Sequence, residues 1–172
     1  MTQALAPWHE FYSLLGSASA TMVGLLFVAA SVGTGMFSRN RLGGLRMFLS
    51  ATVVHFASIL AACLIVLAPI ASAPLLGLMI AGSGLFGLAY YRLALRAAER
   101  DGISARIDRE DRFWYALLPI VGYAGETCSG LGLMARLEPG CVGLAMAMAV
   151  LLLVAIHNAW DITVWSITRE RP

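Results

Sequence analysis

Five polar side chains fall within otherwise apolar stretches of the sequence and are the residues best suited to chemistry. They are His55, Glu126, His157, Asn158 and Asp161. An ionisable side chain at the centre of a membrane helix costs about 2.5–3.5 kcal/mol or more, so each of these groups needs a partner or a function. Imidazole and carboxyl groups exchange protons near neutral pH and bind metal ions.

Four of these residues are predicted to form one inner polar cluster, made of His55, His157, Asn158 and Asp161. Counting 1.5 Å per helical residue from the expected helix ends places all four in the same half of the bilayer. His157 and Asp161 also share a helix face, because they are four residues apart. The cluster has three open interpretations: a structural hydrogen-bonded group, a proton or cation pathway, and a metal site built from His55, His157 and Asp161.

Glu126 is expected in the opposite half of the bilayer, about 20 Å from the inner end of its helix. Gly122, Glu126 and Gly130 follow one another at four-residue spacing, so the acid lies on a face of small residues and away from lipid. Loss of hydration disfavours the charged form of a carboxyl group. We therefore expect Glu126 to be a neutral, hydrogen-bonded acid.

These residues must be positioned by membrane-spanning helices. The 172-residue chain is 59% hydrophobic and only 13% charged, against about 25% charged in soluble domains, so it has too little charge to cover a water-facing surface. Five apolar stretches are long enough to cross a bilayer as helices. The sequence predicts an all-α bundle in one transmembrane domain, residues 1–172, with spans at about 11–36, 48–67, 74–93, 113–134 and 141–167.

The arginines predict the orientation of the bundle. Five alternating spans place eleven of the twelve arginines on one side, most of them in the hairpin at 92–112, and leave Arg136 alone on the other. Positive residues gather on the cytoplasmic side of a membrane. We therefore expect the N-terminus outside and the C-terminus inside.

Rows of small residues predict where helices pack closely. Gly16, Ala20 and Gly24 follow one another at four-residue spacing and indicate a tight contact, either within the chain or between subunits. Gly82, Gly84 and Gly87 match the dinucleotide pattern G-x-G-x-x-G, but no βαβ unit surrounds them. We read these glycines as helix contacts, and we expect no cofactor and no nucleic acid.

Two segments carry a resemblance to known proteins. FYSLLGSASATMVGLLFVAASV (Phe11 to Val32) and HNAWDITVW (His157 to Trp165) resemble small uncharacterised bacterial membrane proteins, some of them labelled modulator of FtsH protease. The resemblance implies a multi-pass protein of the bacterial inner membrane and no established activity. It carries over no catalytic residues.

Two functions remain open at this point. The first is a non-enzymatic regulator or assembly partner of another membrane complex, acting through helix contacts with that complex or with a second copy. The alternative is a small oligomeric channel, or a proton- or cation-coupled transporter, that uses the inner polar cluster and Glu126. An enzyme is not expected, because the sequence contains neither H-E-x-x-H nor a Ser, His and Asp pattern typical of hydrolases.

Overall fold

The computed structural model describes residues 6–33, 42–70, 72–100, 112–137 and 139–168. Every regular element in these ranges is helical, as predicted. A short 3-10 turn, η1 (Ala6–Trp8), leads into five long helical segments. These are α2 (His9–Gly33), α3 (Leu42–Leu67), α4 (Ala73–Arg100), the π-helical turn η3 (Phe113–Leu117) continued by α6 (Leu118–Met134), and α7 (Pro139–Thr168).

Two helix ends differ from the predicted spans in ways that matter for the polar residues. α3 begins at Leu42 rather than at Phe48, which adds almost two turns before His55. α4 continues past the apolar stretch to Arg100, so the first part of the predicted hairpin is helix. The rest of that hairpin lies outside the described residues.

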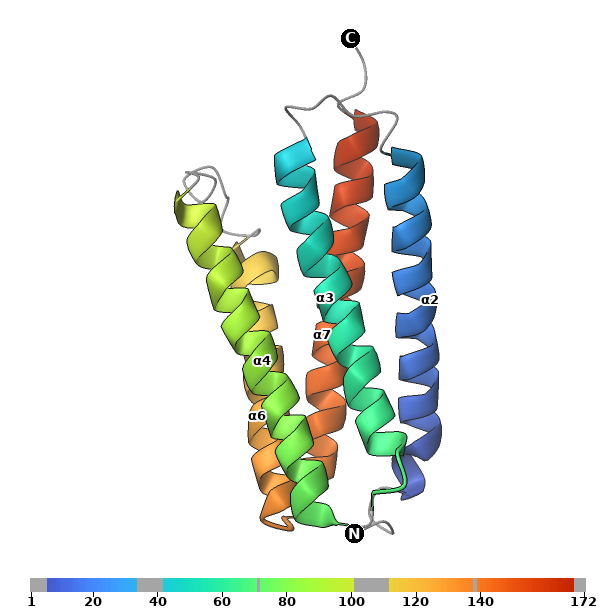
Figure 1. Cartoon of the computed structure of the whole chain (residues 1–172), viewed down its shortest axis with the longest axis vertical. Helices are drawn as coiled ribbons and strands as arrows, with labels where there is room; N and C mark the ends of the chain where they lie inside the picture. The colour runs from blue at the N-terminus through green and yellow to red at the C-terminus, as the bar shows by residue number, and fades with distance from the viewer. Residues whose placement is uncertain (1–5, 34–41, 71, 101–111, 138, 169–172) are drawn as a thin grey trace.

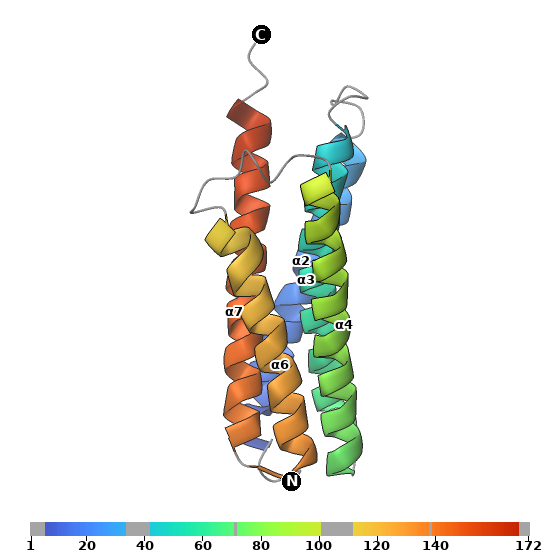
Figure 2. The same cartoon turned by 90° about the vertical axis from the view of Figure 1, so that its left-hand side faces the viewer.

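Four helices form a closed ring around the core, and the fifth packs on its outside (Figures 1 and 2). Going round the ring, α3 contacts α4, α4 contacts α6, α6 contacts α7, and α7 returns to α3. α2 packs mainly against α3. α2 begins at one end of the bundle and α7 finishes at the other, so the helices alternate in direction (Figure 1).

The closest helix contact lies between α4 and α6. A Cβ added to Gly84 would lie 2.5 Å from Thr127 Oγ1 and 2.9 Å from the Tyr123 carbonyl oxygen. One added to Gly130 would lie 2.8 Å from the Gly77 carbonyl oxygen. Backbones that approach this closely gain van der Waals contact, which is how helices associate when lipid removes the hydrophobic drive.

One glycine of the G-x-G-x-x-G pattern does not take part in this contact. A Cβ at Gly84 or Gly87 would collide with α6, whereas one at Gly82 would meet no described atom within 4 Å. The reason is helical geometry, because a residue two positions away points to the opposite side of the helix. The expectation that all three glycines pack against a neighbour is therefore wrong for Gly82.

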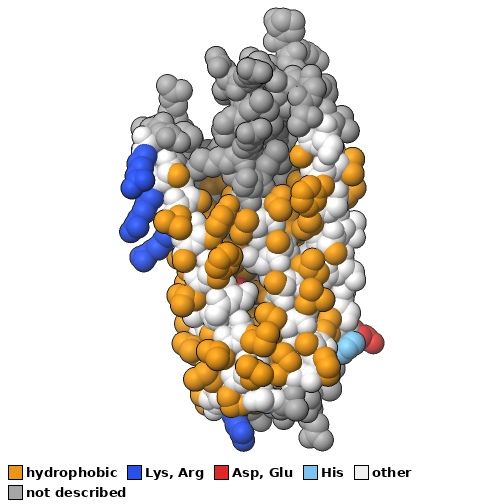
Figure 3. Space-filling model, in the orientation of Figure 1, with side chains coloured by type: hydrophobic (Ala, Val, Ile, Leu, Met, Phe, Trp, Pro, Cys, Tyr) orange, Lys and Arg blue, Asp and Glu red, His pale blue; other side chains and the backbone are white. Residues whose placement is uncertain are grey.

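The outside of the bundle is suited to a bilayer. Within the described ranges, three helices are long and apolar enough to cross a membrane: α2 over His9–Ser31, α4 over Ala73–Ala97 and α7 over Pro139–Asp161. α3 and α6 lie alongside them, and Ala51–Leu67 is a shorter apolar stretch. Hydrophobic side chains cover the middle of the face in Figure 3, while basic side chains form a row at its upper left and a single patch at its lower end. The chain therefore has the make-up of an integral membrane protein.

Candidate functional site

The structure divides the polar residues into two groups instead of one cluster. The first group lies in the core, where α3, α4 and α6 meet. His55 is 1% exposed, and its Nδ1 lies 2.8 Å from the Tyr123 hydroxyl in a hydrogen bond. The Tyr123 hydroxyl also lies 3.4 Å from Ser58 Oγ, one turn along α3 from His55. The Tyr91 ring packs against the His55 ring at 5.5 Å between centroids.

Gly87 makes the space for this hydrogen bond. The Tyr123 ring lies directly over Gly87 of α4, where even a methyl group would collide with it. The ring is therefore fixed between α4 and His55, and Tyr123 itself is fully buried. His55 Nε2 is also buried and has no hydrogen-bond partner among the described residues.

Glu126 follows Tyr123 by one turn of α6 and is fully buried. Ser83 of α4 and Cys63 of α3 are its polar neighbours. Neither carboxyl oxygen reaches a hydrogen-bond partner within the described part of the chain. Ser83 is the neighbouring side chain that can donate to this acid, so the expected hydrogen bond stays a prediction, and the expected place of Glu126 away from lipid agrees with its burial.

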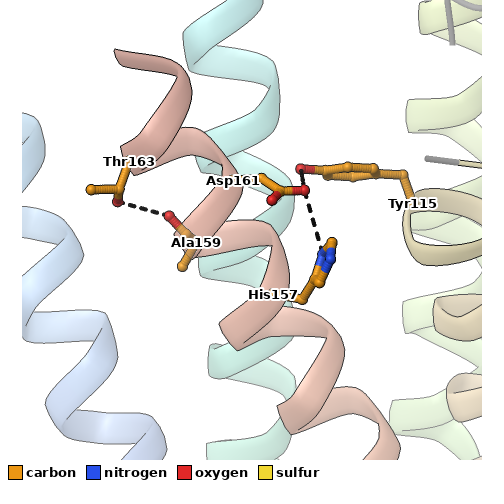
Figure 4. A network of polar contacts seen from close by, with 5 residues as sticks. All are labelled: Tyr115, His157, Ala159, Asp161 and Thr163. Atoms are coloured by element: carbon orange, nitrogen blue, oxygen red, sulfur yellow. Dashed lines mark hydrogen bonds and ion pairs between the residues drawn. The ribbon is translucent and has the colours of Figure 1, made fainter. Parts of the chain in front are cut away.

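The second group lies between α7 and the π-helical turn η3 (Figure 4). His157 Nδ1 lies 3.4 Å from Asp161 Oδ2, and the Tyr115 hydroxyl donates to the same oxygen at 3.2 Å. The Trp114 ring stacks on the His157 ring at 4.0 Å with an interplanar angle of 4°. The side chains of His157 and Asp161 are 30% and 37% exposed, so this pair lies at the edge of the bundle.

The local shape of η3 brings two neighbouring aromatic residues to α7. Pro119 lacks an N–H group, and in an α-helix its ring would collide with the carbonyl of Tyr115. A π-helical turn just before Pro119 accommodates the ring, and such turns are frequent at functional sites. Trp114 and Tyr115 both contact α7 as a result.

Asn158 faces away from the pair at the edge. It follows His157 directly, and it is 2% exposed with its Oδ1 atom unpartnered among the residues described. Successive residues of a helix point about 100° apart, so α7 presents His157 and Asp161 to η3 and Asn158 to the interior.

The membership of His55 in the predicted inner polar cluster stays a prediction, since the hydrogen bond of His55 goes to α6. His55 makes its recorded polar contacts with α6 rather than with His157 or Asp161. The early start of α3 places His55 about 20 Å from that helix end, which is deeper than a span beginning at about residue 48 would place it. His55 thus belongs near Glu126. The described residues also contain no group of three potential metal ligands, so the metal site considered from His55, His157 and Asp161 is not assembled.

Four aromatic residues of these groups were not predicted to belong to them: Tyr91, Trp114, Tyr115 and Tyr123. Tyr12 of α2 lies outside both groups and is fully buried in one apolar cluster with Cys63 and Cys141, where its hydroxyl has no hydrogen-bond partner among the described residues. For Tyr123 the sequence did hold a signal. Tyr123 and Glu126 are three residues apart, which places the tyrosine side chain on the same helix face as the acid.

The predicted packing residues have mixed outcomes. Gly122 lies against Leu151 of α7, and a Cβ at Gly16 would lie 3.2 Å from the Cys63 Cβ. Ala20 and Gly24 continue the row of Gly16 but are exposed, and no described atom lies within 4 Å of a Cβ at Gly24. Among the described residues, the row therefore packs within the chain at its first member and leaves the other two exposed.

Comparison with known proteins does not assign the chain to a family. No family model, no curated protein and no solved structure matches the chain.

Proposed function

We propose that this chain is a non-enzymatic membrane protein that acts by binding a transmembrane helix of another membrane complex on the outer half of α2. The observation that supports this proposal is the row of small residues Gly16, Ala20 and Gly24. Its first member packs against α3, while the other two continue the same face onto an exposed surface. We call the exposed part, Ala20 to Ser31, the α2 outer face.

The chemistry of the α2 outer face favours a helix as its occupant. Small residues allow two backbones to approach closely, and this chain uses the same mode of contact between α4 and α6. Phe27 and Val28 are 63% and 61% exposed and would surround the contact with apolar area. The Thr21 and Ser31 hydroxyls bond to carbonyl groups of their own helix, so they do not demand a polar partner.

Gly24→Leu tests the proposal without disturbing the bundle, because its Cβ has open space. We expect the variant to fold like the wild type but to lose co-purified partner by about tenfold, the equivalent of about 1.4 kcal/mol. Gly82→Leu is the matched control, since it adds the same side chain at an equally open position of α4. Equal recovery of the partner by both variants would rule out the α2 outer face. Differently tagged copies distinguish a second copy of the chain from another protein.

The membrane and the partner class follow from the resemblance stated above. We place the protein in the bacterial inner membrane, and a membrane-bound protease complex is one candidate partner. These assignments rest on the resemblance of the first span and of His157 to Trp165 to those proteins.

We also propose that the end of α4 lies in the cytoplasm. Arg92, Arg96 and Arg100 are exposed there, and Arg136 is exposed at the α6–α7 connection. After replacement of the three native cysteines, Arg100→Cys should be protected from an impermeant thiol reagent in intact cells, while Leu137→Cys should react. The reverse pattern would invert the orientation.

A proton- or cation-coupled transporter is the second candidate. The observation in its favour is the buried polar interior, in which Glu126, His55 and Asn158 all have unpartnered atoms among the described residues. Intramembrane ionisable groups of this kind mark proton and ion pathways in many membrane proteins. Transport by the protein in liposomes, lost in Glu126→Gln, would favour this candidate over the first.

A further inference from the structure

Three arginines form a row at the end of α4. Arg92, Arg96 and Arg100 are exposed and follow one another at four-residue spacing, so their side chains leave the same side of the helix. Figure 3 shows basic side chains in a row at its upper left, beyond the hydrophobic surface. No ion pair with a described carboxylate is recorded for these arginines. The row is therefore without a counterion within the described part of the chain.

The row continues the lipid-facing side of α4. Leu78, Leu85 and Leu93 are 58%, 60% and 64% exposed. Leu85 lies seven residues before Arg92, and Leu93 lies seven residues before Arg100, and a separation of seven residues returns to the same helix face. The opposite side of α4 packs against α6. The exposed side of α4 thus carries an apolar stripe that ends in three positive charges.

The height of the row along α4 matches the headgroup layer of a bilayer. Ala73 and Arg92 are separated by about 28 Å of helix, close to the ~30 Å thickness of the hydrocarbon core. With Ala73 at one surface of the core, Arg92 therefore reaches the opposite surface. Arg96 and Arg100 lie about 6 and 12 Å further along the helix axis, on the side of the headgroups.

An amphiphile matches both parts of this surface. A guanidinium group is planar and binds phosphate through two parallel N–H···O bonds. A free phosphate ion or a soluble acidic peptide would engage the arginines alone. A phospholipid engages the arginines with its phosphate and the apolar stripe with its acyl chains. Because the row carries three positive charges, it favours a headgroup with net negative charge over a zwitterionic one.

We propose that Arg92, Arg96 and Arg100 form a binding site for the headgroup of an anionic phospholipid, whose acyl chains lie along the exposed leucines of α4. We call this site the α4 arginine row. It binds a lipid of whichever leaflet the end of α4 reaches. The site therefore depends neither on the orientation of the chain nor on a partner at the α2 outer face.

Native mass spectrometry of the full chain, titrated with phosphatidylglycerol in mild detergent, tests the site. Replacing all three arginines with glutamine should weaken phosphatidylglycerol binding by about a hundredfold, because each arginine near anionic lipid contributes about fivefold in affinity. Arg136→Gln is the matched control, since it removes an exposed arginine at the other end of the bundle and should bind like the wild type. Equal affinity of the triple glutamine variant and the wild type would overturn the proposal. Arg96→Gln, expected to bind about fivefold more weakly, replaces the triple variant if that variant does not purify as a folded protein.

Three other results would also overturn the proposal. Equal wild-type affinity for phosphatidylglycerol and phosphatidylcholine would show that the acidic residues after α4 in the sequence neutralise the row. Displacement of phosphatidylglycerol by an equal concentration of glycerol phosphate would show a plain anion site. Loss of a co-purified acidic protein from the triple variant, with lipid binding unchanged, would assign the row to a protein partner. Gly24→Leu should bind phosphatidylglycerol like the wild type, which separates failure of this site from failure of the α2 outer face.

Discussion

Replacing Gly84 with leucine is expected to prevent assembly of the bundle, whereas the same change at Gly82 is expected to be tolerated. At Gly84 the new side chain would collide with the Thr127 backbone nitrogen, 2.7 Å from the Cβ, and with the Tyr123 carbonyl oxygen. Backbone atoms of a packed helix cannot move aside as a flexible side chain can. The cost should reach at least about 3 kcal/mol, the upper part of the range for overpacked cores.

The measurement is the fraction of each variant that purifies as a monodisperse species in mild detergent, followed by its thermal midpoint. Gly82→Leu has open space around its Cβ and should match the wild type within a few degrees. If the two variants behave alike, α4 and α6 do not meet in the way described.

Truncation of Tyr123 should be the most damaging change in the polar core. Tyr123→Ala removes a fully buried ring that packs on Gly87 and His55, and it should cost about 3–5 kcal/mol. Tyr123→Phe keeps the ring and removes only the hydroxyl, leaving His55 Nδ1 without that partner. It should cost about 1–3 kcal/mol, the penalty of an unsatisfied buried group.

Unfolding in graded amounts of denaturing detergent, followed by tryptophan fluorescence, compares these two variants with the wild type. The expected order of stability is wild type, then Tyr123→Phe, then Tyr123→Ala. A Tyr123→Phe variant as unstable as Tyr123→Ala would assign the main contribution to the hydroxyl rather than to the ring.

The five-helix fold could be predicted from the sequence because a helix that crosses a bilayer must have a minimum length and few polar side chains. The i, i+4 spacing of His157 and Asp161 likewise anticipated their contact. Both inferences depend on distances within one helix, where the rise and twist per residue are known.

Relations between helices were harder to predict. The extra turns of α3 lie in LGGLRM, where two glycines and an arginine weaken the sequence pattern of an apolar helix. The predicted start of this helix was therefore too late, and His55 was placed too close to that helix end. The pairing of His55 with Tyr123 depends on the register of α3 against α6, which no periodicity within one helix contains. Gly16 and Gly24 are both glycines of the same four-residue row, yet of the two only Gly16 lies against a described atom of α3.

The most direct test of the proposed function is site-specific photocrosslinking in living cells at two phenylalanine positions. A photoreactive phenylalanine analogue at Phe27 reports on the α2 outer face, and the same analogue at Phe86 reports on α4, where the native side chain is similarly exposed at 66% against 63%. We expect a discrete crosslink to one membrane protein from position 27 and only lipid adducts from position 86. Lipid adducts alone from both positions, or a protein crosslink from position 86 only, would contradict it.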